Sequence, residues 1–203
     1  MKVNPVSAIV SMPSTSPSPK KLCFPSWGGT SPCTLGVAGI SDNLRGIKMT
    51  DEAVVTADID EFERLNEFAA AYIEAALWSS NDDADDSGGE PLDRNYDESD
   101  IAPETLARMS EDCLVFLANR LGGRLIAIAE RLEAEGAWSL PAGTGCSVLA
   151  YAGHDAWLTR NGHGCGFDDG DWPRGIAEGL AKLAEEFGEY NLYLGDDHRI
   201  HGA

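Results

Sequence analysis

The chain changes character at Met49, and this change limits which part of it can fold. Residues 1–48 are rich in Ser, Pro and Gly, contain Asp42 as their one acidic residue, and show neither helical nor strand periodicity. We expect disorder there. Residues 49–203 carry periodic apolar patterns and are long enough to bury about two thirds of their surface in one domain. The sequence therefore predicts a single domain that begins near residue 50.

Two explanations of residues 1–48 stay open. A targeting or transit peptide is basic, rich in Ser and poor in acids, as this segment is. Such a peptide normally forms an Arg-rich amphipathic helix, whereas Arg45 is the only arginine before Met49. A misannotated extension, with its start codon placed ahead of the natural one, is therefore favoured.

The domain after Met49 is strongly acidic. The chain has 15 basic and 34 acidic residues; five of the basic and one of the acidic residues precede Met49, which leaves 10 and 33 and a net charge of −23. Such a body repels nucleic acid and anionic lipid and attracts basic protein surfaces. A compositional preference for Arg, Ala and Gly, or a salty cytoplasm, explains the same charge without any partner.

Cysteine usage and hydropathy indicate the cellular compartment. The five cysteines form no Cys-x-x-Cys pair, so neither a disulfide framework nor a zinc knuckle is indicated. No run approaches the ~18 apolar residues that span a bilayer. We therefore expect a cytoplasmic protein that binds no membrane, no metal and no cofactor.

Apolar residues spaced by three and four predict two helical regions in the first half of the domain. Asp58 followed by Glu61 predicts a capping box at the start of the first helix, which extends to about Trp78. The second region begins at Pro103. Gly122-Gly123 interrupts it, so it is either one kinked helix or two helices.

The C-terminal half predicts a helix and a small sheet. A helix is expected from about Pro173 to Gly188. Asn161-Gly162 is the strongest short-range hairpin signal, and we expect it to join two strands over residues 153–167. A further strand is expected at Tyr190–Leu194. About three to four helices with an antiparallel sheet of about three strands make an α+β domain.

The expected hairpin gathers the candidate functional side chains. In a two-residue turn, His154 and His163 share one face but lie roughly 20 Å apart at ~3.4 Å per residue. They cannot ligate one zinc ion, whose ligands lie within ~2.3 Å, so His154 with Asp169 is the better pair. The candidate residues of the hairpin are His154, Asp155, Trp157, Thr159, Arg160, Asn161 and His163.

Two interpretations of the hairpin tip stay open. Arg160 and His163 either hydrogen-bond to their neighbours in a polar turn, which is favoured, or contact an anion or substrate. The glycines Gly162, Gly164 and Gly166 do not follow the G-x-G-x-x-G pattern and precede no helix directly. A phosphate-binding loop is therefore disfavoured.

The acidic loop over residues 81–100 is a second candidate site. Residues 83–88 match the first half of a calcium-binding loop, but its twelfth position is Arg94 and not Glu. A solvated acidic surface is therefore favoured over a tight calcium site. The candidate acidic residues are Asp82, Asp83, Asp85, Asp86 and Glu90.

Three stretches between residues 66 and 197 carry a resemblance to a known family. They are Tyr72–Ser80, Gly153–Gly164 with the pattern G-H-D-x-W-L-T-R-N-G-H-G, and Leu192–Asp197. In these stretches the chain resembles a family of small, acidic, uncharacterised proteins of bacteriophages, prophages and plasmids. Relatives have an aromatic residue at Ala156 and a small residue at Cys165. The resemblance implies an origin in a mobile element and no established activity.

Two functions are compatible with the sequence, and the oligomeric state stays open. The first is a non-catalytic protein whose acidic surface binds a basic host or defence protein, by imitating the charge of DNA. Common hydrolase, protease and NTPase signatures are missing, which favours it. The second is a small-molecule or nucleotide-processing enzyme with His154, Asp155, Arg160 and His163 around a cleft. Burial of the hairpin face would make most of the motif architectural.

Overall fold

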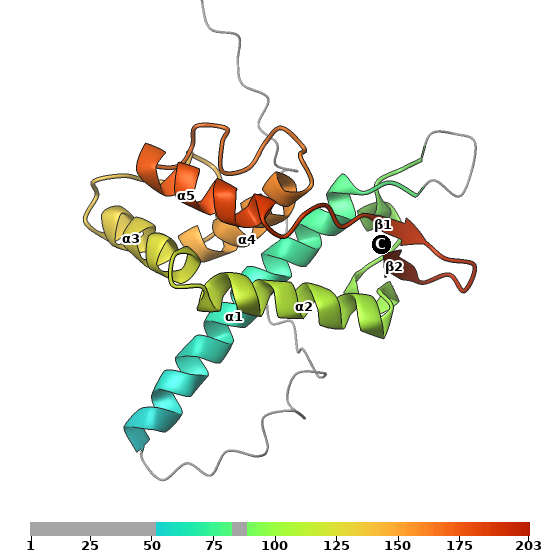
Figure 1. The fold of residues 1–203 in the computed structure, drawn as a ribbon, viewed down its shortest axis with the longest axis horizontal. Helices are drawn as coiled ribbons and strands as arrows, with labels where there is room; N and C mark the ends of the chain where they lie inside the picture. Colours follow the sequence, from blue (N-terminus) through green and yellow to red (C-terminus); the bar gives the residue numbers. More distant parts are fainter. Residues whose placement is uncertain (1–51, 83–88) are drawn as a thin grey trace, which may run out of the picture.

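The computed structural model describes residues 52–82 and 89–203, and these form five α-helices and one two-stranded sheet (Figure 1). The helices are α1 (Glu52–Ser79), α2 (Pro103–Ala118), α3 (Gly122–Ala134), α4 (Val148–Arg160) and α5 (Arg174–Glu185). The strands are β1 (Leu192–Leu194) and β2 (Ile200–Gly202), and the short 3-10 helices η1 (Leu92–Arg94) and η2 (Glu98–Asp100) link α1 to α2. The predicted α+β class is confirmed, but the described residues form five α-helices where about three to four were expected and two strands where about three were expected.

Two of the predicted segments cannot be compared with the structure. The N-terminal extension over residues 1–48 lies outside the described residues. The same holds for Asp83, Asp85 and Asp86 of the acidic loop.

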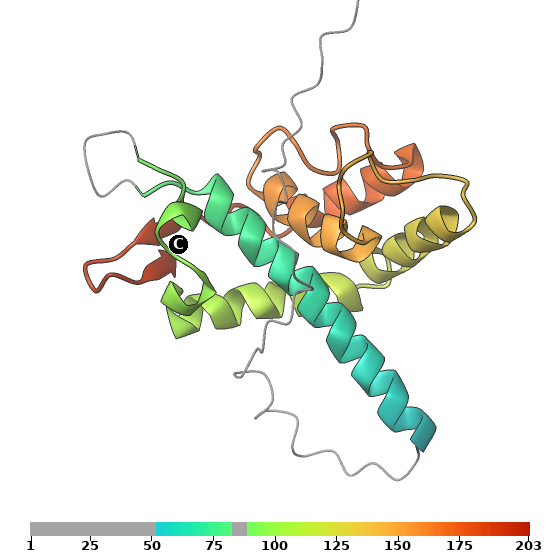
Figure 2. The ribbon, with the colours of Figure 1, turned by 180° about the vertical axis from the view of Figure 1, so that it is seen from behind.

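Helix α1 is the central helix of the fold. Its C-terminal part packs along α4 and crosses α2, while its N-terminal end projects from the body (Figures 1 and 2). Aromatic rings fill both contacts. The rings of Phe68 and Phe116 stack with their centroids 5.3 Å apart, and the rings of Tyr72 and Trp157 meet edge to face with their centroids 5.2 Å apart. Such ring pairs stabilise a core beyond the area they bury.

Gly153 sets the distance between α1 and α4. A Cβ atom at this position would lie 2.2 Å from the carbonyl oxygen of Phe68. Any side chain would therefore push the two helices apart, and only glycine permits this spacing.

The N-terminal helix begins earlier than predicted, at Glu52 and not at Asp58. No Gly or Pro lies between these positions, and alanines, the best helix formers, occupy positions 53 and 57. The helix therefore continues through Asp58 and Glu61 instead of starting there.

The second helical region is two helices, one of the two predicted alternatives. Helix α2 ends at Ala118 and α3 begins at Gly122. A Cβ on Gly122 would lie 2.5 Å from the carbonyl oxygen of Phe116 and 2.7 Å from the Leu183 side chain. Any side chain at position 122 would clash with the end of α2 and with α5, so the turn between α2 and α3 requires glycine there.

The predicted hairpin over residues 153–167 is wrong, because its first strand is part of helix α4. Asn161-Gly162 is a turn, but it ends a helix: Gly162 has a φ of 64° and donates its N–H to the Thr159 carbonyl. Glycine just past a helix end takes this left-handed conformation. Every α4 residue except Thr159 is buried, so the sequence lacks the polar stripe that marks an amphipathic helix.

The sheet therefore has two strands. β1 and β2 are antiparallel, with Tyr193 opposite His201. The outer edge of β2 is attached to the start of α2, since the Ala102 N–H donates to the Ile200 carbonyl at 2.8 Å and the Gly202 N–H donates to Thr105 Oγ1 at 3.1 Å. Among the described helices, none has both the length and the apolar character needed to cross a bilayer.

Candidate functional site

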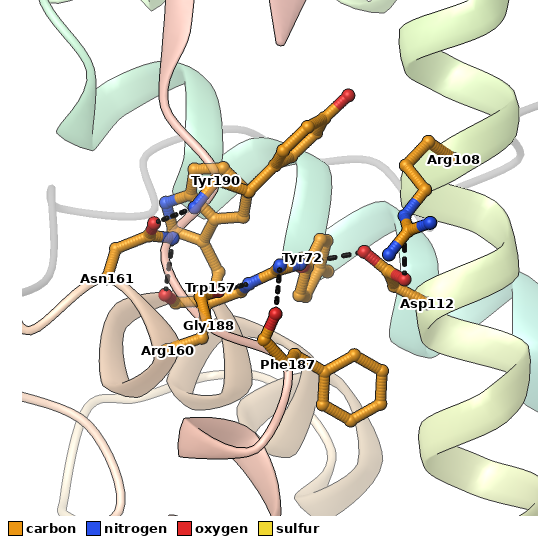
Figure 3. Close-up of polar contacts among 9 residues, drawn as sticks. All are labelled: Tyr72, Arg108, Asp112, Trp157, Arg160, Asn161, Phe187, Gly188 and Tyr190. Carbon is orange, nitrogen blue, oxygen red and sulfur yellow. Dashed lines mark hydrogen bonds and ion pairs between the residues drawn. The ribbon is translucent and has the colours of Figure 1, made fainter. Parts of the chain in front are cut away.

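Arg160, the last residue of α4, lies at the centre of a buried polar network (Figure 3). Its Nη1 donates to the Tyr72 hydroxyl at 2.5 Å and to Asp112 Oδ2 at 2.8 Å. Its Nε donates to the Gly188 carbonyl at 2.8 Å, and its Nη2 donates to the Phe187 carbonyl at 3.3 Å. One guanidinium thus connects α4 to α1, α2 and the segment after α5.

The charged groups of this network have further partners within the protein. Asp112 uses its second carboxylate oxygen for Arg108, 3.1 Å away, while the rings of Phe187 and Tyr190 lie 5.7 and 5.5 Å from the Arg160 guanidinium carbon. Arg160, which donates to two carbonyl groups just after α5, also complements the partial negative charge of that helix C-terminus. Burial raises the pKa of Tyr72, which keeps its hydroxyl neutral. The cavity beside Arg160 measures about 10 Å³, the lower limit for one water molecule.

A second buried network surrounds His154 and Asp155 on the same helix. His154 Nδ1 lies 2.9 Å from Asp155 Oδ1, and Trp172 Nε1 donates to Asp155 Oδ2 at 2.6 Å. The imidazole lies between the rings of Trp78 and Tyr151, at 6.1 and 6.2 Å. Burial raises the pKa of Asp155, and the hydrogen bonds from His154 and Trp172 offset part of that rise.

Two further carboxylates border this second network. The Tyr151 hydroxyl donates to Asp171 Oδ2 at 3.0 Å, and the Asp171 N–H donates to Asp169 Oδ1 at 3.0 Å. Burial raises the pKa of Asp169 to about 6, and the negative charges of Asp155 and Asp171 add to the rise. Asp169 therefore changes charge in a pH range where most carboxylates are fully ionised.

The Cys146 thiol is poorly suited to nucleophilic catalysis. Cys146 precedes Ser147, the N-cap residue of α4. Burial and the nearby carboxylates of Asp155, Glu67 and Glu74 raise the pKa of Cys146 to about 11. Since the thiolate is the reactive form, this thiol is inert at neutral pH. Within residues 52–82 and 89–203, no three His, Cys, Asp or Glu side chains converge to hold a metal ion.

The remaining predicted hairpin residues also have structural partners. Trp157 Nε1 donates to Ser79 Oγ at 2.9 Å, and Thr159 Oγ1 accepts the Phe167 N–H at 3.1 Å. Asn161 Oδ1 accepts the Tyr190 N–H at 2.8 Å. These contacts hold the chain that follows α4 and α5 against the helices.

His163 and the glycines of the motif form no site with Arg160. His163 is exposed in the loop after α4, whereas Arg160 is buried. Gly166 has a φ of 124°, and a Cβ there would lie 2.4 Å from Thr159 Oγ1. Gly166 therefore serves the packing of the loop on α4.

Sequence reasoning missed Tyr72, Asp112 and Trp172, which complete the two networks. Asp112 carries a signal in the sequence, because it lies between Met109 and Cys113 on the apolar stripe of α2. A charged residue at such a position is buried and needs a partner of opposite charge. The identity of that partner, Arg160, depends on the tertiary fold.

A line of acidic side chains remains exposed on α1. Asp60, Glu63, Glu67 and Glu74 are all exposed. At 100° per residue they fall within roughly 60° of the helix circumference. We call this line the α1 acidic stripe. It forms no ion pair with any residue in the described ranges, although Glu67 accepts a hydrogen bond from Ser147 Oγ at 2.5 Å.

The candidate acidic loop contributes two described residues. Glu90 is exposed, while Asp82 is half-buried and donates its N–H to the Glu90 carbonyl at 2.8 Å. They form the neck of the loop, which follows directly on the C-terminal end of α1.

Comparison with known proteins gives no match to a protein family, a curated protein or a solved structure.

Proposed function

We propose that this is a non-catalytic accessory protein of a bacteriophage or other mobile element, which binds a basic host or defence protein through its acidic surface. The observation that carries the proposal is the division of polar groups between inside and outside. His154, Asp155 and Arg160 are buried in internal contacts, and the α1 acidic stripe faces solvent. Groups held in this way stabilise the fold, whereas exposed charges remain available to a partner.

The α1 acidic stripe suits a basic surface. Its four carboxylates extend over roughly 21 Å at 1.5 Å per residue, an average of ~7 Å between neighbours. A line of negative charge on a rigid helix imitates one strand of nucleic-acid phosphates, at lower charge density and with less regular spacing. With a net charge of −19 on the whole chain, the surrounding field steers basic proteins toward this stripe.

The alternative function, a small-molecule or nucleotide-processing enzyme, requires an accessible cleft around residues 153–167, where the sequence predicted a hairpin. His154 and Asp155 are 6% and 1% exposed, and the cavity beside Arg160 has room for at most one water molecule. Cys146 is held as a protonated thiol. Because no observation supports a substrate site there, the proposal is restricted to binding.

The test is displacement of duplex DNA from purified DNA-binding proteins of a bacterial host, measured by fluorescence anisotropy. We expect the protein to displace DNA from at least one of them. The triple variant Asp60→Asn/Glu63→Gln/Glu67→Gln should displace it at least tenfold less well, because the local charge line is removed.

The matched control is Glu178→Gln/Glu185→Gln/Glu186→Gln, which removes three exposed charges elsewhere. It should stay within about twofold of the original protein, since total charge changes equally in both variants. Equal losses in both triple variants, or failure to displace DNA at any concentration, would refute the proposal.

A further inference from the structure

A surface hollow of about 450 Å³ lies at the turn between β1 and β2. The hollow is largely open to solvent. The residues that line it are Tyr193, Leu194, Gly195, Asp196, Asp197 and His201. The hollow shares no residue with the buried networks, and all its lining residues except His201 belong to the Leu192–Asp197 stretch that the sequence singled out.

Cross-strand contacts fix one wall of the hollow. Tyr193 and His201 are directly opposite in the antiparallel register, and their rings stack with centroids 5.7 Å apart and planes 28° apart. His201 is further held by Asp197 Oδ1, 3.0 Å from Nε2, and by Glu104 Oε1, 3.6 Å from Nδ1. Tyr193, 49% exposed, therefore presents an aromatic face whose orientation is set before a ligand arrives.

Gly195 lets the backbone close on this wall. A Cβ on Gly195 would lie 2.6 Å from His201 Cδ2 and 2.8 Å from Asp197 Oδ1. A side chain there would separate His201 from Asp197. The bare backbone is thus part of the shape of the hollow.

The chemistry of the lining selects an organic cation. Hydrogen bonds from His201 and from the Arg199 N–H hold the pKa of Asp197 below its usual range, so its carboxylate stays ionised. Asp196 adds a second exposed carboxylate, and no Lys or Arg lines the hollow. An aromatic face beside carboxylates attracts cations. A guanidinium suits it better than an ammonium, because it is planar, stacks on rings and pairs with carboxylates through two N–H groups.

We propose that this hollow binds the guanidinium of an arginine side chain on the basic partner, with the group stacked on Tyr193 and paired with Asp196 and Asp197. The inference rests on the proposed function, which supplies a partner rich in arginine. A guanidinium site adds one specific contact to the electrostatic attraction between the acidic protein and its basic partner.

The test is an NMR titration of the ¹⁵N-labelled protein with N-acetyl-arginine amide. Saturable shifts of the Gly195, Asp196 and Asp197 amides are expected at millimolar concentration. The neutral analogue N-acetyl-citrulline amide should give none, and N-acetyl-lysine amide should bind at least threefold more weakly. Equal shifts from citrulline or lysine, or shifts spread over all exposed acids, would overturn the inference.

Variants separate this inference from the proposed function. Tyr193→Ala and Asp196→Asn/Asp197→Asn should each weaken arginine-amide binding at least fivefold, while Glu189→Gln, an exposed acid outside the lining, should leave it unchanged. The dispersion of each amide spectrum reports whether the variant is folded. Unchanged arginine binding in Tyr193→Ala would refute the hollow as a site, yet DNA displacement that still depends on the α1 acidic stripe would leave the proposed function intact.

Discussion

Arg160 and Asp112 are opposite charges that are each 6% or less exposed, with 2.8 Å between their bonded atoms. Removing Asp112 leaves the Arg160 charge buried without a carboxylate partner, and removing Arg160 leaves the buried Asp112 with only the exposed Arg108 as its ion-pair partner. Exposed ion pairs differ, because water and salt screen both partners. Arg174 with Glu178 on α5 is such a pair, with side chains 94% and 65% exposed.

Replacing Arg160 by Met should therefore lower the free energy of unfolding by about 3–5 kcal/mol. The double variant Arg160→Met/Asp112→Leu should lose less than the two single variants summed, because no unpaired buried charge remains. Urea denaturation measures both, and Arg174→Met should change stability by less than about 0.5 kcal/mol. Strict additivity of the two changes would contradict the structural role of the pair.

Asp169 should make stability depend on pH between the unfolded pKa of 3.8 and the folded value of about 6. A carboxyl group whose folded pKa is raised binds its proton more tightly in the folded state. Its contribution is thus fully present below pH 3.8 and is lost as the pH rises through 6. Because the group is half-buried, we expect a contribution on the order of 1 kcal/mol after solvent screening.

Asp169→Asn isolates this contribution. The amide keeps an oxygen to accept the Asp171 N–H, and it does not titrate. At pH 7.5 the variant should be more stable than the original protein in urea denaturation, and near pH 4 the difference should vanish. Parallel pH profiles for the two proteins would rule out the raised pKa of Asp169.

At the scale of elements, the contact between α1 and α4 depends on Gly153. Gly153→Ala should cost about 1–3 kcal/mol through overpacking against Phe68, although alanine favours helix by about 1 kcal/mol. The matched control is Gly175→Ala in α5, where a Cβ would meet nothing within 4 Å. The control should be neutral or stabilise by up to about 1 kcal/mol, and equal effects at both positions would argue against close packing at Gly153.

The helices that can be predicted from sequence are those with one buried and one solvent-exposed face. α2 and α5 alternate buried and exposed residues with helical periodicity, and the sequence indicated both. α4 is buried on nearly all sides, so its Ala-Trp-Leu-Thr-Arg run reads equally well as a strand. The glycine turn after it was located correctly and was assigned to a hairpin, because Asn-Gly serves both hairpins and helix ends.

In the candidate site, too, the sequence indicates individual residues but not the distant residues that they contact. The sequence indicates Trp157, Arg160 and Asn161 as candidate functional residues, and in the structure each forms a specific side-chain hydrogen bond. Their partners Ser79, Asp112 and Tyr190 are 78, 48 and 29 residues away in the chain. No local pattern encodes such pairings, so the distinction between an exposed tip and a buried network required the fold.

For the whole molecule, the central claim is that exposed negative charge, and not a catalytic cleft, performs the function. Arg160 and Asp155 form buried hydrogen bonds that hold the helices together, whereas the acids of the α1 acidic stripe are exposed. We propose that these exposed acids meet the partner. Electrostatic attraction between exposed surfaces weakens as salt rises, because raising the ionic strength from ~0.1 to ~1 M shortens the Debye length from ~10 to ~3 Å. Apolar burial is not weakened in this way.

The most direct test is therefore the dissociation constant for a DNA-binding protein that the acidic protein displaces from DNA, measured across that salt range. The constant should rise at least tenfold with salt, and it should rise much less for Asp60→Asn/Glu63→Gln/Glu67→Gln, which starts from weaker binding. A constant that is independent of salt, or a salt dependence that the triple variant leaves unchanged, would contradict the account.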